Sequence, residues 1–187
     1  MAAAKVSALR WIREQTRMGV LRPITRGLYL NQLARPQPTA AEAAGFVRSG
    51  AIVSLQSVLG DAGVTNSSSD IVTSVTPLRG RIGPSSRPTV ANGVEYRFHA
   101  MPERLLGEEA GQLEDRMDLN AAYPRATPEK ALLEWLYLGL SPRTKLALPP
   151  LDIELDRLDA ARLDRLAARM HLSRPLKEYY SRMSPRL

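Results

Sequence analysis

The chain has 187 residues, 44% of them hydrophobic and none of them cysteine, and its formal net charge at pH 7 is +7. This length is enough for one modest core, or for a small module followed by a larger one. Without cysteine the chain can form no disulfide framework, thiolate nucleophile or cysteine-ligated metal site. No apolar run approaches the roughly 20 residues of a membrane span, so we expect a cytoplasmic protein without a membrane partner.

The positive charge is concentrated near the N-terminus. Residues 1–48 hold eight basic and two acidic residues, a net charge of +6 that leaves +1 for residues 49–187. A basic segment joined to a near-neutral body indicates a polyanion-binding element attached to a domain with another task. The alternative is an arginine-rich face that only aids solubility.

Residues 3–18 predict a helix with a basic side and an apolar side. Arg10, Arg13 and Arg17 are spaced i, i+3, i+7 and therefore fall within a narrow arc. Trp11 belongs to a different side of the same helix, among other apolar residues. One face of this helix can therefore contact a polyanion while the other packs.

The helix is followed by a predicted β-hairpin. Gly19 is expected to end the helix, and residues 20–30 predict two short strands around the turn Arg26-Gly27. This order is typical of the recognition helix and wing of a winged helix-turn-helix, in which the helix enters the major groove and the wing contacts phosphate or the minor groove. The predicted DNA-binding residues are Lys5, Arg10, Arg13, Arg17, Arg22 and Arg26.

A complete winged-helix module needs two further helices before the recognition helix, and only a few residues precede Val6. Residues 1–33 are therefore predicted to form a truncated winged-helix DNA-binding element. The apolar side of its helix would have to pack on the body, on a second copy or on another protein. A misplaced start codon, a degenerate module and a module completed by dimerisation all fit the sequence.

A proline-containing linker, residues 34–38, separates this element from a second predicted domain, residues 39–187. Thr39 and Glu42 form the pattern of a capping box at the start of a helix. Residues 51–61 predict a buried helix that ends at Gly63.

The middle of the chain predicts a small antiparallel sheet. Residues 70–77 are rich in β-branched residues, and residues 93–99 alternate enough to be their antiparallel partner. The arginine-containing loop between them, residues 78–88, is interpreted as an exposed hairpin tip rather than a phosphate-binding loop. Residues 103–118 are acidic, and we interpret them as a solvated face in preference to a surface that covers a basic partner.

Residues 126–134, Ala-Thr-Pro-Glu-Lys-Ala-Leu-Leu-Glu, predict the start of an amphipathic helix. Thr127 is suited to the N-cap, and Pro128 to the first helical position, where its missing amide hydrogen costs nothing. Glu129 complements the positive end of the helix dipole. Residues from 155 to the end predict a packing helix, closed by Arg174-Pro175, and a last short helix.

Two of these segments resemble the AbiEi family of antitoxins and transcriptional regulators from type IV toxin-antitoxin systems. They are Thr25-Arg26-Gly27-Leu28-Tyr29 and residues 126–134, the latter preceded by Tyr123-Pro124-Arg125. The family usually carries aspartate in place of Glu134. The resemblance extends from Val6 to about Met170, and its motif residues with a structural role are Gly27, Tyr29, Thr127, Pro128, Glu129 and Lys130.

The resemblance implies an α+β fold, in which a helix and β wing precede a mixed α/β antitoxin-type domain with a small antiparallel sheet. It also implies an antitoxin and DNA-binding autorepressor that counteracts a nucleotidyltransferase toxin in phage defence. Promoter DNA and the toxin would be partners, and a homodimer is also compatible. The alternative is an interaction-only antitoxin that neutralises the toxin by direct contact without specific DNA binding.

Catalysis is not expected. The two histidines, His99 and His171, have no cysteine or regularly spaced carboxylate beside them, and the sequence contains no nucleophile motif or P-loop. We therefore predict no catalytic residue, no metal site and no cofactor.

Overall fold

The computed structural model describes residues 2–66, 70–78, 88–91 and 93–183. The α-helices of this part are α1 (Ala2–Arg17), α2 (Ala44–Val47), α3 (Gln56–Asp61), α4 (Leu113–Arg116), α5 (Pro128–Leu140), α6 (Ala160–Arg169) and α7 (Ser173–Met183). The strands are β1 (Leu21–Thr25), β2 (Leu28–Asn31), β3 (Ile52–Val53), β4 (Ile71–Pro77), β5 (Thr89–Ala91) and β6 (Val94–Met101). Short 3-10 turns are η1 (Ala40–Ala43), η2 (Glu103–Leu105), η3 (Glu108–Ala110) and η4 (Leu155–Arg157).

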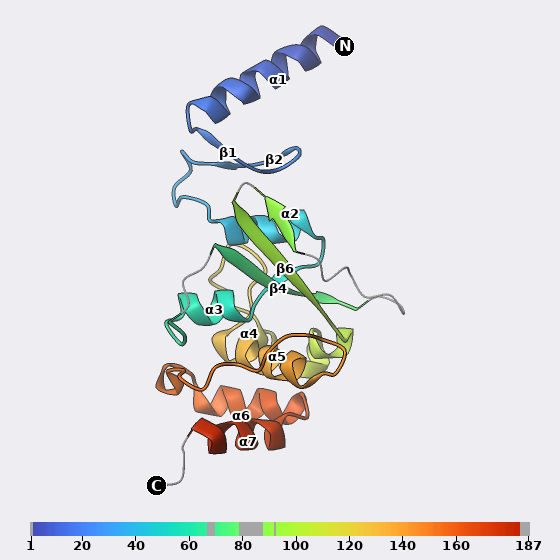
Figure 1. Cartoon of the computed structure of the whole chain (residues 1–187), viewed down its shortest axis with the longest axis vertical. Helices are drawn as coiled ribbons and strands as arrows, with labels where there is room; N and C mark the ends of the chain where they lie inside the picture. The colour runs from blue at the N-terminus through green and yellow to red at the C-terminus, as the bar shows by residue number, and fades with distance from the viewer. Residues whose placement is uncertain (1, 67–69, 79–87, 92, 184–187) are drawn as a thin grey trace.

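The elements are arranged in layers along the long axis of the molecule (Figure 1). The N-terminal helix α1 lies at one end, followed by the β1–β2 hairpin, the main sheet and the helices α3, α4 and α5. Helices α6 and α7 form the opposite end. The predicted α+β class is confirmed.

The chain forms two sheets, and one predicted strand pairing is wrong. Strands β1 and β2 form a two-stranded antiparallel hairpin, and the second sheet has the order β3-β4-β6-β5. Strands β4 and β6 are parallel, from Ile71 opposite Glu95 to Pro77 opposite Met101, although we predicted an antiparallel pair. Parallel neighbours need a long connection, which residues 78–93 supply, and β5 takes the antiparallel position beside β6. Most of the predicted arginine loop, residues 79–87, lies outside the described residues.

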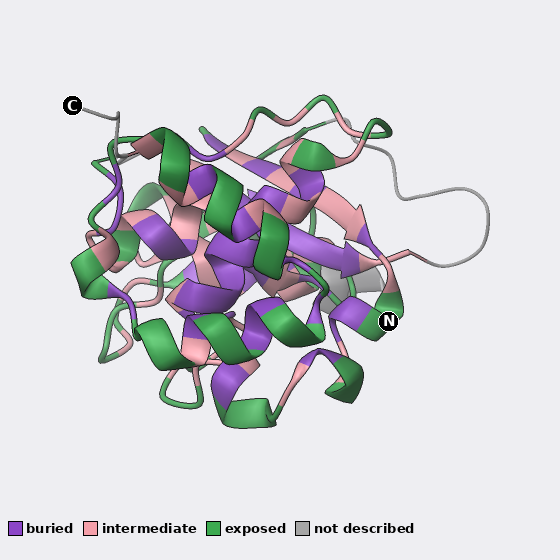
Figure 2. Cartoon of the chain, turned by 90° about the horizontal axis from the view of Figure 1, so that it is seen from below, coloured by how far each residue is buried: buried purple, intermediate pink, exposed green. Residues whose placement is uncertain are grey.

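Both faces of the main sheet are covered. On one face, the Tyr96 hydroxyl donates to the Ala40 carbonyl at 2.9 Å, and the Arg48 guanidinium lies 4.5 Å from the centre of the Phe98 ring. On the other face, the Ser57 amide donates to the Thr73 hydroxyl at 3.0 Å, which attaches α3 to β4. Figure 2 shows the buried residues gathered in the interior, with exposed residues along the outer sides of the helices.

The hairpin shares this core. Ile24 of β1 and Leu30 of β2 are buried and belong to the same apolar cluster as the residues of the main sheet and α5. The wing is therefore packed on the body, although a linker was predicted to follow it.

The predicted helices differ from the observed ones at three places. The helix expected from residue 155 onward begins only at Ala160, because residues 155–157 form the 3-10 turn η4. Residues 51–61 are not one helix, because Val53 pairs with Ser74 of β4 and the chain turns sharply at Leu55, which has a φ of +57°. Only residues from Gln56 onward are helical. Pro175 does not close a helix either, since it lies in the first turn of α7, where a missing amide hydrogen is tolerated.

The other helix boundaries agree with the local chemistry. Gly19 follows α1 with a φ of +74°, and Gly63 follows α3 with a φ of +67°. Thr39 and Glu42 form the predicted capping box, with the Thr39 amide donating to the Glu42 carboxylate at 2.8 Å. Helix α5 begins at Pro128 with Thr127 as its N-cap.

Substitution of Thr127 tests how the N-terminus of α5 is held in place. Its buried hydroxyl accepts from the Lys130 amide at 3.3 Å and donates to the Asp115 carbonyl at 2.6 Å. Thr127→Ala removes the cap and leaves the carbonyl unpaired, so we expect a loss of about 1–3 kcal/mol in the free energy of unfolding. Urea denaturation measures this loss. Thr127→Ser keeps the hydroxyl and should retain most of the stability; equal losses in both variants would contradict the assignment.

Candidate nucleic-acid interface

Helix α1 stands apart from the body and is reached through the hairpin (Figure 1). Its contacts with the described part of the chain run mainly to β1, the strand that follows it. The helix has 16 residues, which corresponds to a length of about 24 Å. Most of its circumference is therefore available for contact with another molecule.

The predicted arginine stripe is present on this helix. Arg10, Arg13 and Arg17 are exposed, and at 3.6 residues per turn they lie within an arc of about 60°. Arg17 forms an ion pair of 2.8 Å with Glu14, but both side chains are exposed. Such a pair is weak, so another anion can replace Glu14 as the partner of Arg17. Arg10 and Arg13 form no ion pair with a described residue. Lys5 belongs to α1, but its side chain is outside the description.

The hairpin carries the two other predicted arginines in different positions. Arg26 is exposed in the turn beside Gly27, whose φ of +84° is rare for residues with a side chain. Arg22 is also exposed, and it lies on β1 directly opposite the buried Leu30. Burial raises the pKa of the Tyr96 hydroxyl, and the nearby charge of Arg22 opposes that rise. Arg26 is therefore the arginine at the tip of the wing.

Exposed apolar side chains lie on α1 and in the segments that follow α1 and the hairpin. Trp11 is 58% exposed and Met18 is 54% exposed, and Leu33, which follows the hairpin, is 66% exposed. Single exposed apolar residues are common, but three large ones at one end of the molecule indicate a surface that can take a protein partner.

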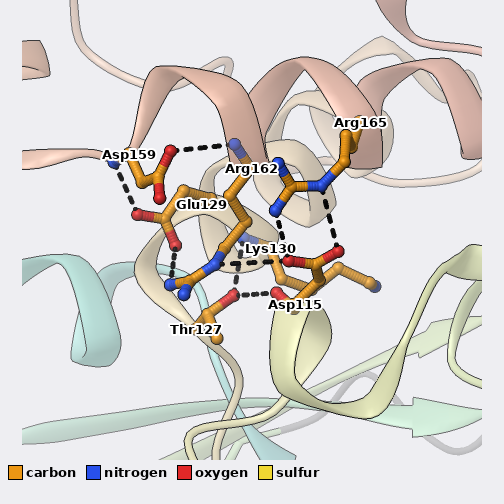
Figure 3. Close-up of polar contacts among 7 residues, drawn as sticks. All are labelled: Asp115, Thr127, Glu129, Lys130, Asp159, Arg162 and Arg165. Carbon is orange, nitrogen blue, oxygen red and sulfur yellow. Dashed lines mark hydrogen bonds and ion pairs between the residues drawn. The ribbon is translucent and has the colours of Figure 1, made fainter.

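The motif at residues 126–134 forms a buried polar network instead of an accessible site (Figure 3). Glu129, which is only 3% exposed, accepts a hydrogen bond of 2.9 Å from the Asp159 amide and lies 3.3 Å from the Arg162 guanidinium. Asp159 in turn caps α6, because its carboxylate accepts from the Arg162 amide at 3.0 Å. The Glu129 carboxylate on α5 therefore holds the start of α6 in place.

Lys130 and Glu134 form a buried ion pair within α5. The Lys130 ammonium also donates to the Leu105 carbonyl at 2.8 Å, and the Ser54 hydroxyl donates to Glu134. These partners belong to η2 and to the segment after β3, so the pair joins α5 to two distant parts of the chain. With Lys130 and Glu134 at 2% and 1% exposure, the pair cannot reach a ligand.

Asp115, Arg162 and Arg165 complete the network and were not singled out from the sequence. The Arg165 guanidinium donates to both oxygens of Asp115, at 2.8 and 3.3 Å, and Arg162 lies 3.5 Å from the same carboxylate. These hydrogen bonds and charges hold the pKa of Asp115 below its usual value. The i, i+3 spacing of the two arginines is a signal for a shared partner, but the identity of the carboxylate depends on a contact between segments far apart in the chain.

The two histidines lie in different environments. His99 is in β6, where burial lowers its pKa and the charge of Arg97 lowers it further. His171 is exposed and follows α6. Neither belongs to the network around Glu129 and Lys130.

Comparison with known proteins gives no assignment: no family model matches the chain, and no curated protein matches it. Of the helices that the structure describes, none has the length and hydropathy needed to cross a membrane.

The pKa of Asp115 predicts how stability depends on pH. A carboxylate whose folded pKa is lowered stabilises the fold above its unfolded pKa of about 3.9, and this contribution is lost as the pH falls through the folded pKa. Asp115→Asn should therefore reduce the free energy of unfolding by about 1–3 kcal/mol at pH 7 and by progressively less below about pH 4.

Urea denaturation between pH 3 and pH 7 measures this difference, with Glu114→Gln as the neighbouring exposed control. The control should have little effect across the range. A difference between Asp115→Asn and the unaltered protein that stays constant to pH 3 would contradict the role of the carboxylate charge.

Proposed function

We propose that the protein is an antitoxin and DNA-binding transcriptional autorepressor of a type IV-like toxin-antitoxin system, of the AbiEi type. The observation that carries the DNA-binding part is the exposed arginine stripe of α1, on a helix followed directly by a β-hairpin with an arginine at its tip.

The dimensions of α1 suit a major groove. An α-helix with its side chains is about 10–12 Å wide, and the major groove of B-DNA is about 12 Å wide. Arg10, Arg13 and Arg17 present guanidinium forks that can bond phosphate oxygens or the edge of guanine. Arg26 would then reach the backbone or the adjacent minor groove, as the wing does in winged-helix proteins.

The antitoxin part of the proposal rests on the resemblance of the two sequence motifs. In the AbiEi family the toxin is a nucleotidyltransferase, so a protein of this kind would be the partner to test. The body, residues 39–187, is the proposed antitoxin domain, and the buried network of α5 supports its rigid packing. A cytoplasmic location follows from this function.

A second candidate function is an interaction-only antitoxin, which neutralises the toxin by direct contact and binds no specific DNA. The exposed side chains of Trp11, Met18 and Leu33 favour it, because they offer an apolar surface on the same end of the molecule as the arginines. The two candidates predict different consequences for the arginine stripe.

The test is a titration of the protein's own promoter DNA at several salt concentrations. The variant Arg10→Ala/Arg13→Ala/Arg17→Ala should lose specific binding, and the slope of log K against log salt should become shallower by up to about 3. Because all three side chains are exposed, the melting temperature should change little. Fluorescence anisotropy and thermal denaturation measure the two effects.

The matched control removes three exposed arginines elsewhere, Arg143→Ala/Arg174→Ala/Arg182→Ala. It should retain specific binding. Equal loss in both triple variants would indicate nonspecific attraction to DNA. Absence of specific binding by the unaltered protein, together with salt-insensitive binding to the toxin that Trp11→Ala abolishes, would favour the interaction-only function.

A further inference from the structure

A second concentration of arginines lines a groove on the opposite end of the molecule from α1. The groove lies between α6 and the segment that includes η3 and α4, and its cavity has a volume of about 830 Å³. We call it the α6 groove, and its lining residues include Gly111, Glu114, Asp115, Arg162, Arg165, Leu166, Arg169 and His171. Its volume is in the range of pockets that hold small molecules.

One wall of the α6 groove is a stripe of arginines. Arg162, Arg165 and Arg169 are spaced i, i+3, i+7 on α6, so they lie within an arc of about 60°. The opposite side of α6, which includes Leu163 and Ala167, is buried against the body. The helix therefore turns its arginines toward the groove because its apolar side is fixed by packing.

The carboxylate of Asp115 orients two of these arginines. Arg165 donates to it through Nε and Nη2, which leaves the Nη1 group of Arg165 available, and Arg162 is held between Asp115 and Glu129. A guanidinium has five N–H donors, so these contacts position the groups without using all of their donors.

Arg169 and His171 supply the donors that are not engaged within the groove. Both are exposed at the C-terminal end of α6, and neither forms an ion pair with a described residue. The acidic residues of the lining are Asp115, already paired with two arginines, and Glu114, which is exposed. The groove thus combines Arg162 and Arg165, which Asp115 orients, with the exposed side chains of Arg169 and His171.

We propose that the α6 groove binds a small phosphorylated ligand, of the size of a nucleoside diphosphate. Arg165, Arg169 and His171 would bond the phosphate oxygens, because guanidinium forks match their geometry. Ala168 lines the same groove and is exposed, so it would contact the less polar part of the ligand. Helix α6 lies at the opposite end of the molecule from α1 (Figure 1).

Isothermal titration calorimetry of the full chain with inorganic pyrophosphate and with ADP tests the proposal. We expect one saturable site, and at least tenfold weaker binding in Arg169→Ala and in His171→Ala. Arg143→Ala, which removes an exposed arginine outside the groove, should bind as the unaltered protein does. Tighter binding of ADP than of pyrophosphate is the expected sign that the less polar part of the lining is also used.

The α1 variant Arg10→Ala/Arg13→Ala/Arg17→Ala separates this site from the proposed DNA interface. It should keep full affinity for ADP even where promoter binding is lost. The proposal is overturned if no saturable binding occurs, or if Arg143→Ala weakens binding as much as Arg169→Ala does. It is also overturned if the α1 variant, rather than Arg169→Ala, abolishes binding. Because Arg169 and His171 are exposed, circular dichroism should show both variants folded.

Discussion

The structure depends on the buried ion pair between Lys130 and Glu134 and on its neighbour Glu129. A pair this deeply buried must be fully hydrogen-bonded, because each charge loses its hydration. The Leu105 carbonyl and the Ser54 hydroxyl meet that requirement, and so hold η2 and the end of β3 against α5. Glu129 binds the first residues of α6 in the same way. The charged residues at the start of α5 thus determine the positions of three other segments.

This arrangement separates a rigid body from an exposed end. The main sheet is covered on both faces, and the hairpin joins its core through Ile24 and Leu30. Helix α1 lies beyond the hairpin, and its three stripe arginines and Trp11 are all exposed. A fixed hairpin with a projecting helix is an arrangement suited to presenting a recognition surface. Helix α1, which carries the proposed DNA interface, and α6, which lines the α6 groove, lie at opposite ends of the molecule (Figure 1).

Local sequence signals predicted the parts of the fold that depend on neighbouring residues. The arc of Arg10, Arg13 and Arg17, the capping box of Thr39 and the cap at Thr127 follow from spacing and side-chain chemistry within a few residues. The antiparallel pairing of residues 70–77 with 93–99 was wrong, because strand direction depends on the intervening connection and on β5. The helix expected over residues 51–61 was wrong at its start, because Val53 pairs with β4. Helix propensity depends on neighbouring residues and cannot predict this long-range pairing. The partner of Arg165 could not be predicted from local spacing either, because Asp115 is 50 residues away in sequence.

A map of amide chemical shifts would show whether α1 and the hairpin form the proposed DNA-contacting surface. The 15N-labelled protein would be titrated with its own promoter duplex at moderate salt. The perturbed amides should cluster in residues 7–31, with the largest changes around Arg10, Arg13 and Arg26, while amides of α5 stay unchanged. Perturbations centred on another surface, or none beyond those caused by an unrelated duplex, would contradict the proposed DNA interface.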